Sequence, residues 1–409
     1  MLRGSSFYLL ITFLFLIAAD LYGLSTEKVD SLYKKSISLI NTYPDSAMVL
    51  ANESMKLSEQ INYDFGRAKS YYIKAYISNR QHHPAQALLY YLKGSEILET
   101  MRDEPSVRDL IKMSMNSAII LRHYKRFKEA HELIDKGLEL VKSHEEYDFV
   151  KLELKLLYNR AAIFQDQETH GLAIQLLDSI TPRNIEIENT NQVFFCWNLS
   201  GILHNDIEDY ARARYFFNQI IAHPEATDYQ KAMAWHNIGL SFQLDQQYDS
   251  AIILYRKALL LKKKILNRSM DERIFNTLSN LMEIYLDKGE HGQAVEVGLE
   301  ALDYYDNVPL EPEHYEIFEY LSTAYHELAE AKASHFYATR FYEENEKYQK
   351  MQNDLMALRD EFQVDEFLKD YYQPQSSEES GTYKFIIVSL ILIVLGLAIF
   401  QARKRLYVM

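Results

Sequence analysis

Cysteine, glycine and proline are all scarce in this chain of 409 residues. The single cysteine, Cys196, excludes an intrachain disulfide and a zinc site built from several cysteines. Thirteen glycines and eight prolines leave long stretches without the residues that interrupt helices. The alternation of apolar and polar residues that is typical of strands is also missing. These absences favour long helices that are held together by an apolar core alone.

Basic charge and catalytic motifs are lacking as well. The chain has 44 lysines and arginines against 58 aspartates and glutamates, and its net charge of −14 argues against a nucleic-acid partner. It contains no P-loop, no G-x-G-x-x-G, no G-x-S-x-G and no H-E-x-x-H. Residues 166–171 resemble a calcium-binding loop only faintly, because Leu177 stands where a bidentate glutamate is required. We therefore expect a protein that is not an enzyme and that needs no metal or other cofactor.

Apolar runs near the two ends predict a signal peptide and a membrane span. The first run follows Arg3 and is too short to cross a bilayer, so residues 1–23 are predicted to be a secretory signal peptide. The sequence is compatible with cleavage after Ala19 or after Gly23. The alternative is that the segment is not cleaved and acts as a signal anchor. In the second run, thirteen of sixteen residues are Leu, Ile, Val or Phe, which predicts a transmembrane helix over 385–402. A buried helix of a soluble domain is the alternative there.

Basic residues flank the predicted span. Lys384 precedes it, and Arg403, Lys404 and Arg405 follow it in a short tail, residues 403–409. By the positive-inside rule this tail lies in the cytoplasm and the exported bulk of the chain lies on the other side. We expect a single-pass protein of a bacterial inner membrane whose bulk is periplasmic, with a eukaryotic lumen as the alternative.

The region between the two apolar runs repeats one spacing six times. A small residue is followed twelve positions later by alanine, and usually four further on by a large apolar residue. Two helices can cross closely only where small side chains face each other, so this spacing predicts antiparallel helix pairs. The pairs of positions are Ala75 and Ala87, Ala118 and Ala130, Ala161 and Ala173, Gly201 and Ala213, Gly239 and Ala251, and Met282 (in place of a small residue) and Ala294.

These segments resemble the tetratricopeptide repeat (TPR), a helix-turn-helix unit of 34 residues. In the clearest copy the matching residues are Trp235, Gly239, Tyr248, Ala251, Tyr255 and Ala258. The resemblance implies an all-α fold, a TPR-type α-solenoid of about seven to eight units with a degenerate repeat or cap at residues 24–67. All eight prolines then fall in loops or at helix starts. The expected array, residues 68–348, contains units at 68–101, 111–144, 154–187, 194–227, 232–265 and 275–308, and a weaker one at 315–348.

After the array the apolar period changes to seven. Phe341, Tyr348, Leu355 and Phe362 share one position of this period. The pattern predicts a stalk or capping helix that extends to 349–372, followed by a linker at 373–384 before the span. Two interpretations stay open for residues 341–362: a cap on the last repeat, or the seam of a weak homodimer.

The TPR resemblance also implies a concave groove, which is lined by positions 2, 5, 9, 12 and 13 of each first helix. In the first units these positions are basic and aromatic, and in the last ones they are acidic (Glu283, Asp287, Glu316, Glu319 and Glu327). Such a groove could bind an extended or helical peptide, although ordinary solvated side chains would give the same pattern. The candidate partner-binding residues are Lys69, Tyr72, Tyr76, Arg80, Lys112, Arg122, His123, Lys155 and Tyr158.

The order of the expected segments resembles the extracytoplasmic sensor half of bacterial membrane-anchored TPR regulators, including histidine kinases. Only nine residues follow Phe400, so the output domain of those proteins is missing. We expect a membrane-tethered scaffold that binds a protein or peptide partner through its groove without catalysis. The alternative is a sensor subunit that passes a conformational signal across the membrane to a separate kinase or transcription regulator.

Overall fold

The computed structural model describes residues 26–361, apart from residues 41, 82, 266–270, 307 and 309 and the side chains of 271 and 351–361. The expected signal peptide, linker, transmembrane helix and basic tail lie outside the described residues. Among the helices that are described, none combines the length and the apolar character that crossing a bilayer requires. The chain divides into two compact units, Met1–Leu358 and Arg359–Met409, and the helical array belongs to the first.

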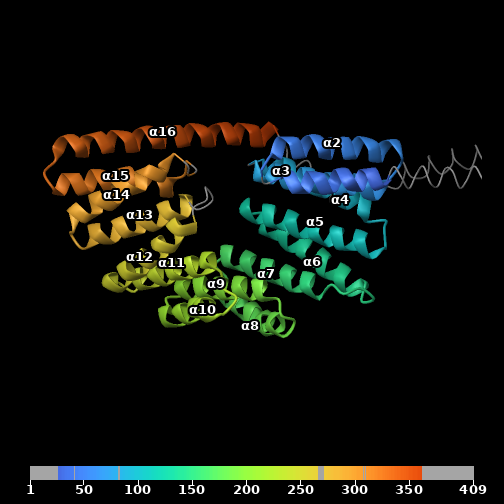
Figure 1. Cartoon of the computed structure of the whole chain (residues 1–409), viewed down its shortest axis with the longest axis horizontal. Helices are drawn as coiled ribbons and strands as arrows, with labels where there is room; N and C mark the ends of the chain where they lie inside the picture. Colours follow the sequence, from blue (N-terminus) through green and yellow to red (C-terminus); the bar gives the residue numbers. More distant parts are fainter. Residues whose placement is uncertain are drawn as a thin grey trace, which may run out of the picture. The chain divides into compact units, whose positions relative to one another are not determined.

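The described part of the array is all-α and consists of helix pairs, as the TPR resemblance implies (Figure 1). A helix over residues 26–39 and α2 (Pro44–Gln60) form the first pair. Seven further first helices follow: α3 (Asp64–Arg80), α5 (Glu104–His123), α7 (Val150–Asp166), α9 (Thr190–Asp206), α11 (Asp228–Leu244), α13 (Asp271–Asp287) and α15 (Pro312–Glu327). Their second helices are α4 (Pro84–Leu98), α6 (Phe127–Ser143), α8 (His170–Glu186), α10 (Tyr210–Ala222), α12 (Tyr248–Ile265), α14 (His291–Tyr305) and α16 (Ala331–Glu361).

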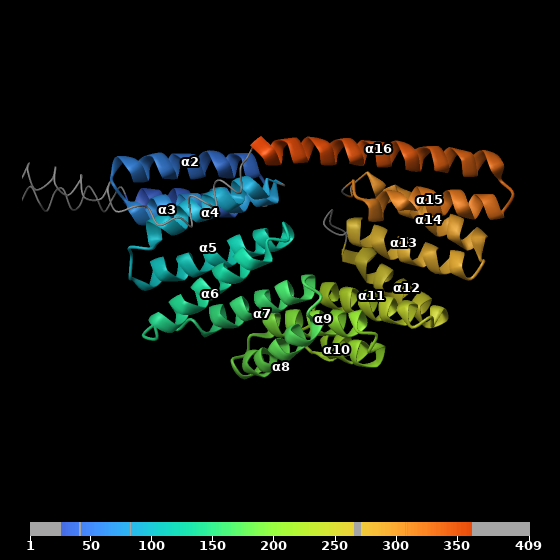
Figure 2. The same cartoon turned by 180° about the vertical axis from the view of Figure 1, so that it is seen from behind.

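The small residues of the repeat lie at the helix crossings, as predicted. Ala75 of α3 and Ala87 of α4 are both fully buried. Gly201 of α9 lies against the ring of Phe217 in α10, so close that an added Cβ would be 2.5 Å from the ring carbons. Each helix pair also contacts the next pair in the chain (Figures 1 and 2). The pairs therefore stack in sequence order, and each buries the apolar side of its neighbour.

The first helices begin before the predicted unit boundaries, by about two turns for α5 and about one turn for the others. For example, α11 begins at Asp228 rather than at 232, and α5 begins at Glu104 rather than at 111. N-terminal caps account for both starts. Thr227 and Gln230 form a capping box, and the Asp103 carboxylate accepts the backbone N–H of Ser106 at 3.2 Å. The repeat signature consists only of residues at the helix crossings. It therefore does not predict the residues that extend each first helix at its N-terminus.

Seven of the described turns between helices place a residue other than glycine in the left-handed region. After α7, for example, Glu168 has φ +58°, and the next backbone N–H, that of Thr169, donates to the carbonyl oxygen of Phe164 at 2.9 Å. This bond satisfies a carbonyl of the last helical turn and reverses the chain direction. The equivalent residues in the other turns are Asn62, Lys125, Glu188, Glu208, Gln246, Gly289 and Ala329.

The prediction that no proline lies inside a helix is wrong for Pro182. This residue lies within α8, one turn before the helix ends at Glu186. It lies on the exposed side of the helix, so the carbonyl oxygen four residues earlier loses its N–H donor but stays open to water. The break that was expected at this proline therefore does not occur.

The last helix, α16, is continuous across residue 348, where a boundary between array and stalk was expected. Phe341 and Tyr348 both contact Tyr315 of α15, with ring centroids 5.7 and 5.9 Å apart. Glu344, which interrupts the period of seven, is buried and ion-paired with Arg340 at 3.0 Å. The first apolar residues of the period of seven, Phe341 and Tyr348, thus cover the last repeat. Leu355 and Phe362 lie outside the described side chains.

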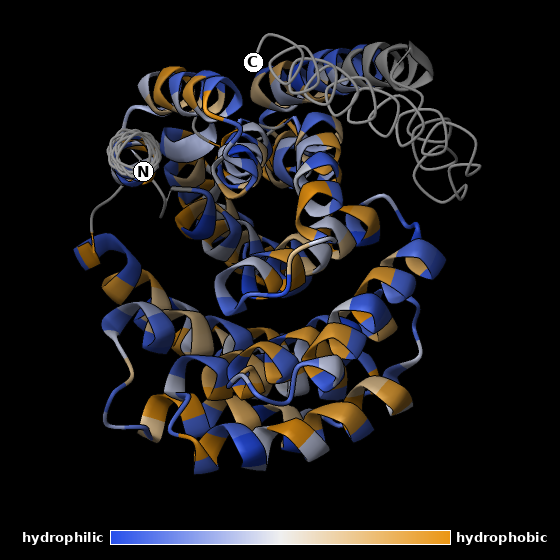
Figure 3. Cartoon of the chain, turned by 90° about the vertical axis from the view of Figure 1, so that its right-hand side faces the viewer, coloured by the Kyte–Doolittle hydropathy of each residue, from blue (hydrophilic) through white to orange (hydrophobic). Residues whose placement is uncertain are grey.

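Apolar and polar residues mix along the helices (Figure 3). The buried apolar residues form successive clusters. One cluster joins α7, α8 and α9 through residues such as Leu177 and Cys196. A second joins α9, α10 and α11 through residues such as Phe194 and Phe217. A third extends from α12 to α15 and contains Tyr255 and Phe275. The core is therefore divided along the array.

Candidate functional site

The candidate site is the surface formed by positions 2, 5, 9, 12 and 13 of the first helices, called here the first-helix surface. Neighbouring first helices contact one another directly from α5 to α15. Side chains at corresponding positions of successive repeats are therefore neighbours in space.

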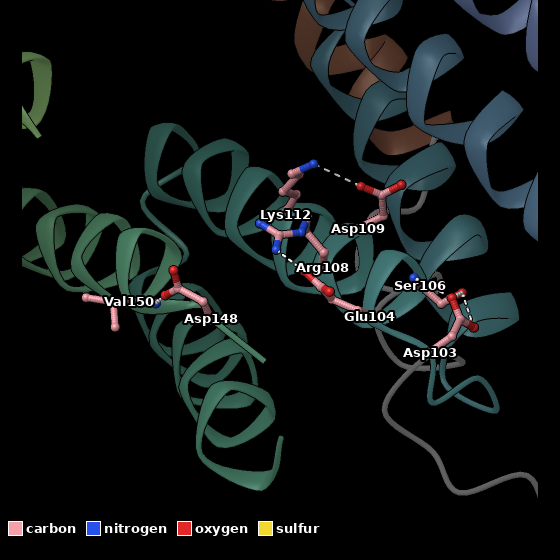
Figure 4. A network of polar contacts seen from close by, with 8 residues as sticks. All are labelled: Asp103, Glu104, Ser106, Arg108, Asp109, Lys112, Asp148 and Val150. Atoms are coloured by element: carbon pink, nitrogen blue, oxygen red, sulfur yellow. Dashed lines mark hydrogen bonds and ion pairs between the residues drawn. The ribbon is translucent and has the colours of Figure 1, made fainter. Parts of the chain in front are cut away.

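Three of the six basic side chains expected at the start of this surface are ion-paired with carboxylates. The ammonium of Lys69 lies 3.0 Å from Asp30, and Lys112 lies 3.0 Å from Asp109 (Figure 4). Arg122 of α5 lies 3.2 Å from Asp166 of α7. Carboxylates of the same or the adjacent repeat therefore supply the counter-charges for these three residues, which lowers the net positive charge expected at this end.

Three of the predicted basic residues stay exposed. Arg80 and His123 lie in the last turns of their helices, α3 and α5, and Lys155 lies near the start of α7. Burial of part of the ring and the charge of Arg122 lower the pKa of His123 below its usual value. The exposed positive charge at neutral pH is thus limited to Arg80 and Lys155 among these three.

The predicted tyrosines divide into packed and open positions. Tyr72 packs edge-on against Tyr91 with centroids 5.7 Å apart, and its burial raises its pKa. Tyr76 is 37% exposed. Tyr158 contacts the ring of Phe195 in α9 at 6.0 Å, and burial, together with the thiol of Cys196, raises its pKa to about 12.

Phe195 belongs to the surface but was not among the predicted residues. Its side chain is 54% exposed although it is large and apolar. It occupies position 2 of its unit, so the positional rule that gave Lys69 and Lys112 would have found it. Tyr158, Phe195 and the exposed Lys155 together form an aromatic and basic patch between α7 and α9.

Hydrogen bonds donated by side-chain amides link the first helices in the middle of the surface. The amide of Asn237 in α11 donates to Asn198 of α9 at 2.8 Å. The amide of Gln243 in α11 donates to the carboxylate of Glu283 in α13 at 2.7 Å. Residues about 40 positions apart form these bonds, one repeat length, so the composition of a single helix gives no signal for them.

The acidic end of the surface is present as predicted. Burial and the nearby carboxylates of Glu313, Glu319 and Glu283 raise the pKa of Glu316. Burial and the same group of carboxylates raise the pKa of Tyr320 to about 12. Asp287 accepts a hydrogen bond from the hydroxyl of Tyr248 at 3.1 Å. Within the described part of the chain, none of these carboxylates has a lysine or arginine within ion-pair distance, so their negative charge is uncompensated.

A buried lysine near the surface was not predicted. Lys262 of α12 is 1% exposed and donates to Thr277 Oγ1 at 2.6 Å and to the carbonyl oxygen of Arg273 at 3.0 Å. His236 Nδ1 lies 3.0 Å from the same hydroxyl. Burial and the charge of Arg273 lower the pKa of Lys262 to about 7. In the sequence, Lys262 is one of three consecutive lysines, a pattern that indicates a solvated helix end.

The described residues offer little reactive chemistry. No group of three or more His, Cys, Asp or Glu side chains among them could hold a metal ion. Cys196 is fully buried, and burial raises the pKa of its thiol to about 11. A thiol in this state is protonated and shielded from reagents at neutral pH.

Comparison with known proteins agrees on the fold. No family model matches the sequence, and none of the curated proteins is a match for it. The signal-transduction ATPase PH0952 from Pyrococcus horikoshii, which has a TPR sensor, matches with a TM-score of 0.57 and 11% identity over 83% of this chain and 50% of that one. The quorum sensor NprR from B. thuringiensis matches with a TM-score of 0.48 and 13% identity over 78% of this chain and 99% of its own. A TPR protein from Parabacteroides merdae matches with a TM-score of 0.46 and 15% identity over 73% of this chain and 99% of its own. The chain is a TPR-like α-solenoid.

Proposed function

We propose that this protein binds a protein or peptide partner along its first-helix surface and has no catalytic role. The main support for this proposal is the patch formed by Tyr158, Phe195 and Lys155. A phenylalanine that is 54% exposed and packed on a half-buried tyrosine is a rigid apolar anchor that folding leaves open. Exposed aromatic side chains of this kind dominate the energetics of protein interfaces.

The charge distribution supports a preferred orientation of the partner. Carboxylates without cations lie on α13 and α15, whereas three of the six basic residues at the start of the surface are paired. A partner with a basic segment that lies toward α15 gains favourable Coulomb energy there. Glu316 and Glu319 are the residues to which we assign this contact.

We further propose that the chain acts as a membrane-tethered extracytoplasmic scaffold, with residues 385–402 as its span. The apolar composition of that segment and its flanks, Lys384 and Arg403 to Arg405, support this. A second role, as a sensor subunit, is supported by α16. This helix is continuous from Ala331 in the last repeat to Glu361, so one helix follows the array along the chain in the direction of the proposed span.

Photo-crosslinking in intact cells tests the binding proposal directly. Phe195→Ser removes the exposed anchor, and Tyr215→Ser is its matched control, because Tyr215 is 58% exposed on the second helix α10. We expect the Phe195→Ser variant to lose a crosslinked partner that the wild type and the control both retain. Equal recovery in all three proteins would overturn the assignment of the surface.

A deletion of residues 385–409 separates the two roles. The scaffold role requires the membrane anchor only for location, so partner crosslinking by the exported soluble form should persist. The sensor role requires the span itself, so a downstream response should disappear even while the partner stays bound. Release of the intact wild-type chain from membranes without detergent would refute tethering.

A further inference from the structure

Basic side chains from three helices meet where α11, α12 and α13 join. The ammonium of Lys262 and the Nδ1 atom of His236 both lie within hydrogen-bond distance of the Thr277 hydroxyl, at 2.6 and 3.0 Å. Burial, together with the charge of the Arg273 guanidinium, lowers the pKa of both groups. Three groups that can carry positive charge are therefore close together.

No acidic partner for this group is found among the described side chains. The guanidinium of Arg273 lies over the ring of Tyr229 at 4.9 Å and donates to Met233 Sδ at 3.3 Å. Several other arginines of the array are paired with carboxylates, as Arg183 is with Glu153 at 2.8 Å. In a chain with a net charge of −14, a cationic cluster without a carboxylate is conspicuous.

The cluster can be reached from the first-helix surface. Met233 and His236 occupy positions 2 and 5 of their unit, the positions that define this surface. Arg273 is partly exposed beside them, whereas Lys262 is buried behind Thr277. A ligand on the surface could therefore contact Arg273 directly. It would interact with Lys262 only through the Coulomb attraction of the buried charge.

We propose that Arg273, with His236 and Lys262 behind it, forms a subsite for a carboxylate group of the bound partner. The inference rests on the proposed function, which supplies a protein or peptide as the ligand, and it specifies where one acidic group of that ligand lies. The planar guanidinium of Arg273 makes the direct contact, because its paired N–H groups match the two carboxylate oxygens. Lys262 is a positioning residue that acts through its charge.

Occupation of this subsite takes up a proton near neutral pH. Lys262 is held by neutral acceptors only, and the titratable groups that face it are His236 from α11 and Arg273 from α13. Burial and the charge of Arg273 lower the pKa of Lys262 to about 7, and burial lowers the pKa of His236 well below its usual value. An arriving carboxylate offsets the repulsion and raises the pKa of Lys262. By linkage, the carboxylate binds more tightly where Lys262 is charged, at pH 6, than where it is neutral, at pH 8.5.

N-acetylglycine is a suitable probe, because it carries one carboxylate, and N-acetylglycinamide is its neutral counterpart. The full-length chain in detergent micelles would be labelled with ¹³C at its methionine methyl groups, and the methyl of Met233 would report on Arg273. At constant ionic strength we expect a saturable shift of this resonance with N-acetylglycine, with a dissociation constant of roughly a few millimolar. From pH 6 to pH 8.5 the affinity should fall by about tenfold.

Three variants make the test specific. Arg273→Gln should abolish the saturable shift, and Arg256→Gln should preserve it, because Arg256 donates to the hydroxyl of Tyr285, away from the cluster. Lys262→Met should still bind the probe, with an affinity that no longer depends on pH between 6 and 8.5. The other methionine resonances report whether each variant is folded.

Three results would each overturn the subsite. These are an equal shift with the neutral amide, a saturable shift that persists in Arg273→Gln, and no saturation by the acid at pH 6. The crosslinking comparison of Phe195→Ser with Tyr215→Ser does not involve these residues. Failure of the subsite and failure of the proposed function are therefore seen separately.

Discussion

Gly201 of α9 and Phe217 of α10 are in such close contact that a methyl group on the glycine would lie 2.5 Å from the ring. Gly171, near the start of α8, has no such neighbour within 4 Å of an added Cβ. The two positions therefore separate packing from helix propensity, since both glycines are helical. Only the first is required by the crossing of two helices.

Gly201→Ala should destabilise the fold. Overpacking costs about 1–3 kcal/mol, and the better helix propensity of alanine returns at most about 1 kcal/mol. Gly171→Ala should be neutral or stabilising, because the added methyl group meets no neighbour and only the better helix propensity of alanine acts. Thermal unfolding followed by circular dichroism measures both changes. Phe217→Leu in the Gly201→Ala background should recover part of the loss, and equal stability of the two glycine variants would contradict the close crossing.

Lys262→Met should stabilise the protein near neutral pH. The pKa of Lys262 is about 7 in the folded chain and near its ordinary value of 10.5 in the unfolded chain. The unfolded chain therefore binds more protons between these values, and wild-type stability should rise with pH from 7 to 10 by a term on the order of 4 kcal/mol. Below pH 7 both states are protonated at this site and the penalty is constant.

The measurement for this variant is urea denaturation at several pH values. The difference in unfolding free energy between Lys262→Met and the wild type should be largest at pH 7 and should shrink toward pH 10. The Thr277 hydroxyl can still donate to the carbonyl of Arg273 at 2.8 Å, so the variant leaves no orphaned donor there. A difference that does not change with pH would show that Lys262 is solvated.

Ala329→Gly should stabilise the turn between α15 and α16. Ala329 is exposed and has φ +61°, a conformation that costs alanine about 1 kcal/mol and glycine nearly nothing. The gain is reduced by the greater entropy of glycine in the unfolded chain, so we expect about 0.5 kcal/mol. Gly289→Ala, at φ +70° in the turn between α13 and α14, is the reverse experiment and should destabilise. Stabilisation of the protein by Gly289→Ala would refute this account of the turns.

Cys196 should react with thiol reagents only after unfolding. Its thiol is buried, and burial raises its pKa to about 11, so the thiolate is rare at pH 8. Labelling with Ellman's reagent should be slow in buffer and fast in urea, and its rate should follow the opening of α9. Prompt labelling of the folded protein would show that the contact between α8 and α9 opens readily.

Crossing positions could be predicted from the sequence because each repeat must supply them locally. Ala75 and Ala87, twelve residues apart, are such a pair. The ion pairs of the basic residues could not be predicted, since Lys69 is paired with Asp30, which lies 39 residues earlier. Only the register between successive repeats brings these two residues together.

Two other features escaped prediction for physical reasons of their own. Pro182 remains inside α8 because the carbonyl it orphans faces water, and the sequence does not say which side of a helix is exposed. Lys262 is buried beside two lysines that stay exposed, a distinction that depends on where α13 packs. The acidic end could be predicted, because Glu316 and Glu319 lie on the same helix.

The divided core has a mechanical consequence. Phe194 and Cys196 lie in one helix, yet they belong to separate apolar clusters, so α9 fastens one section of the array to the next. Tension applied along the chain would detach hairpins one after another, because each holds only to its neighbours. Rupture would proceed in steps, and a section could re-form once the load was released.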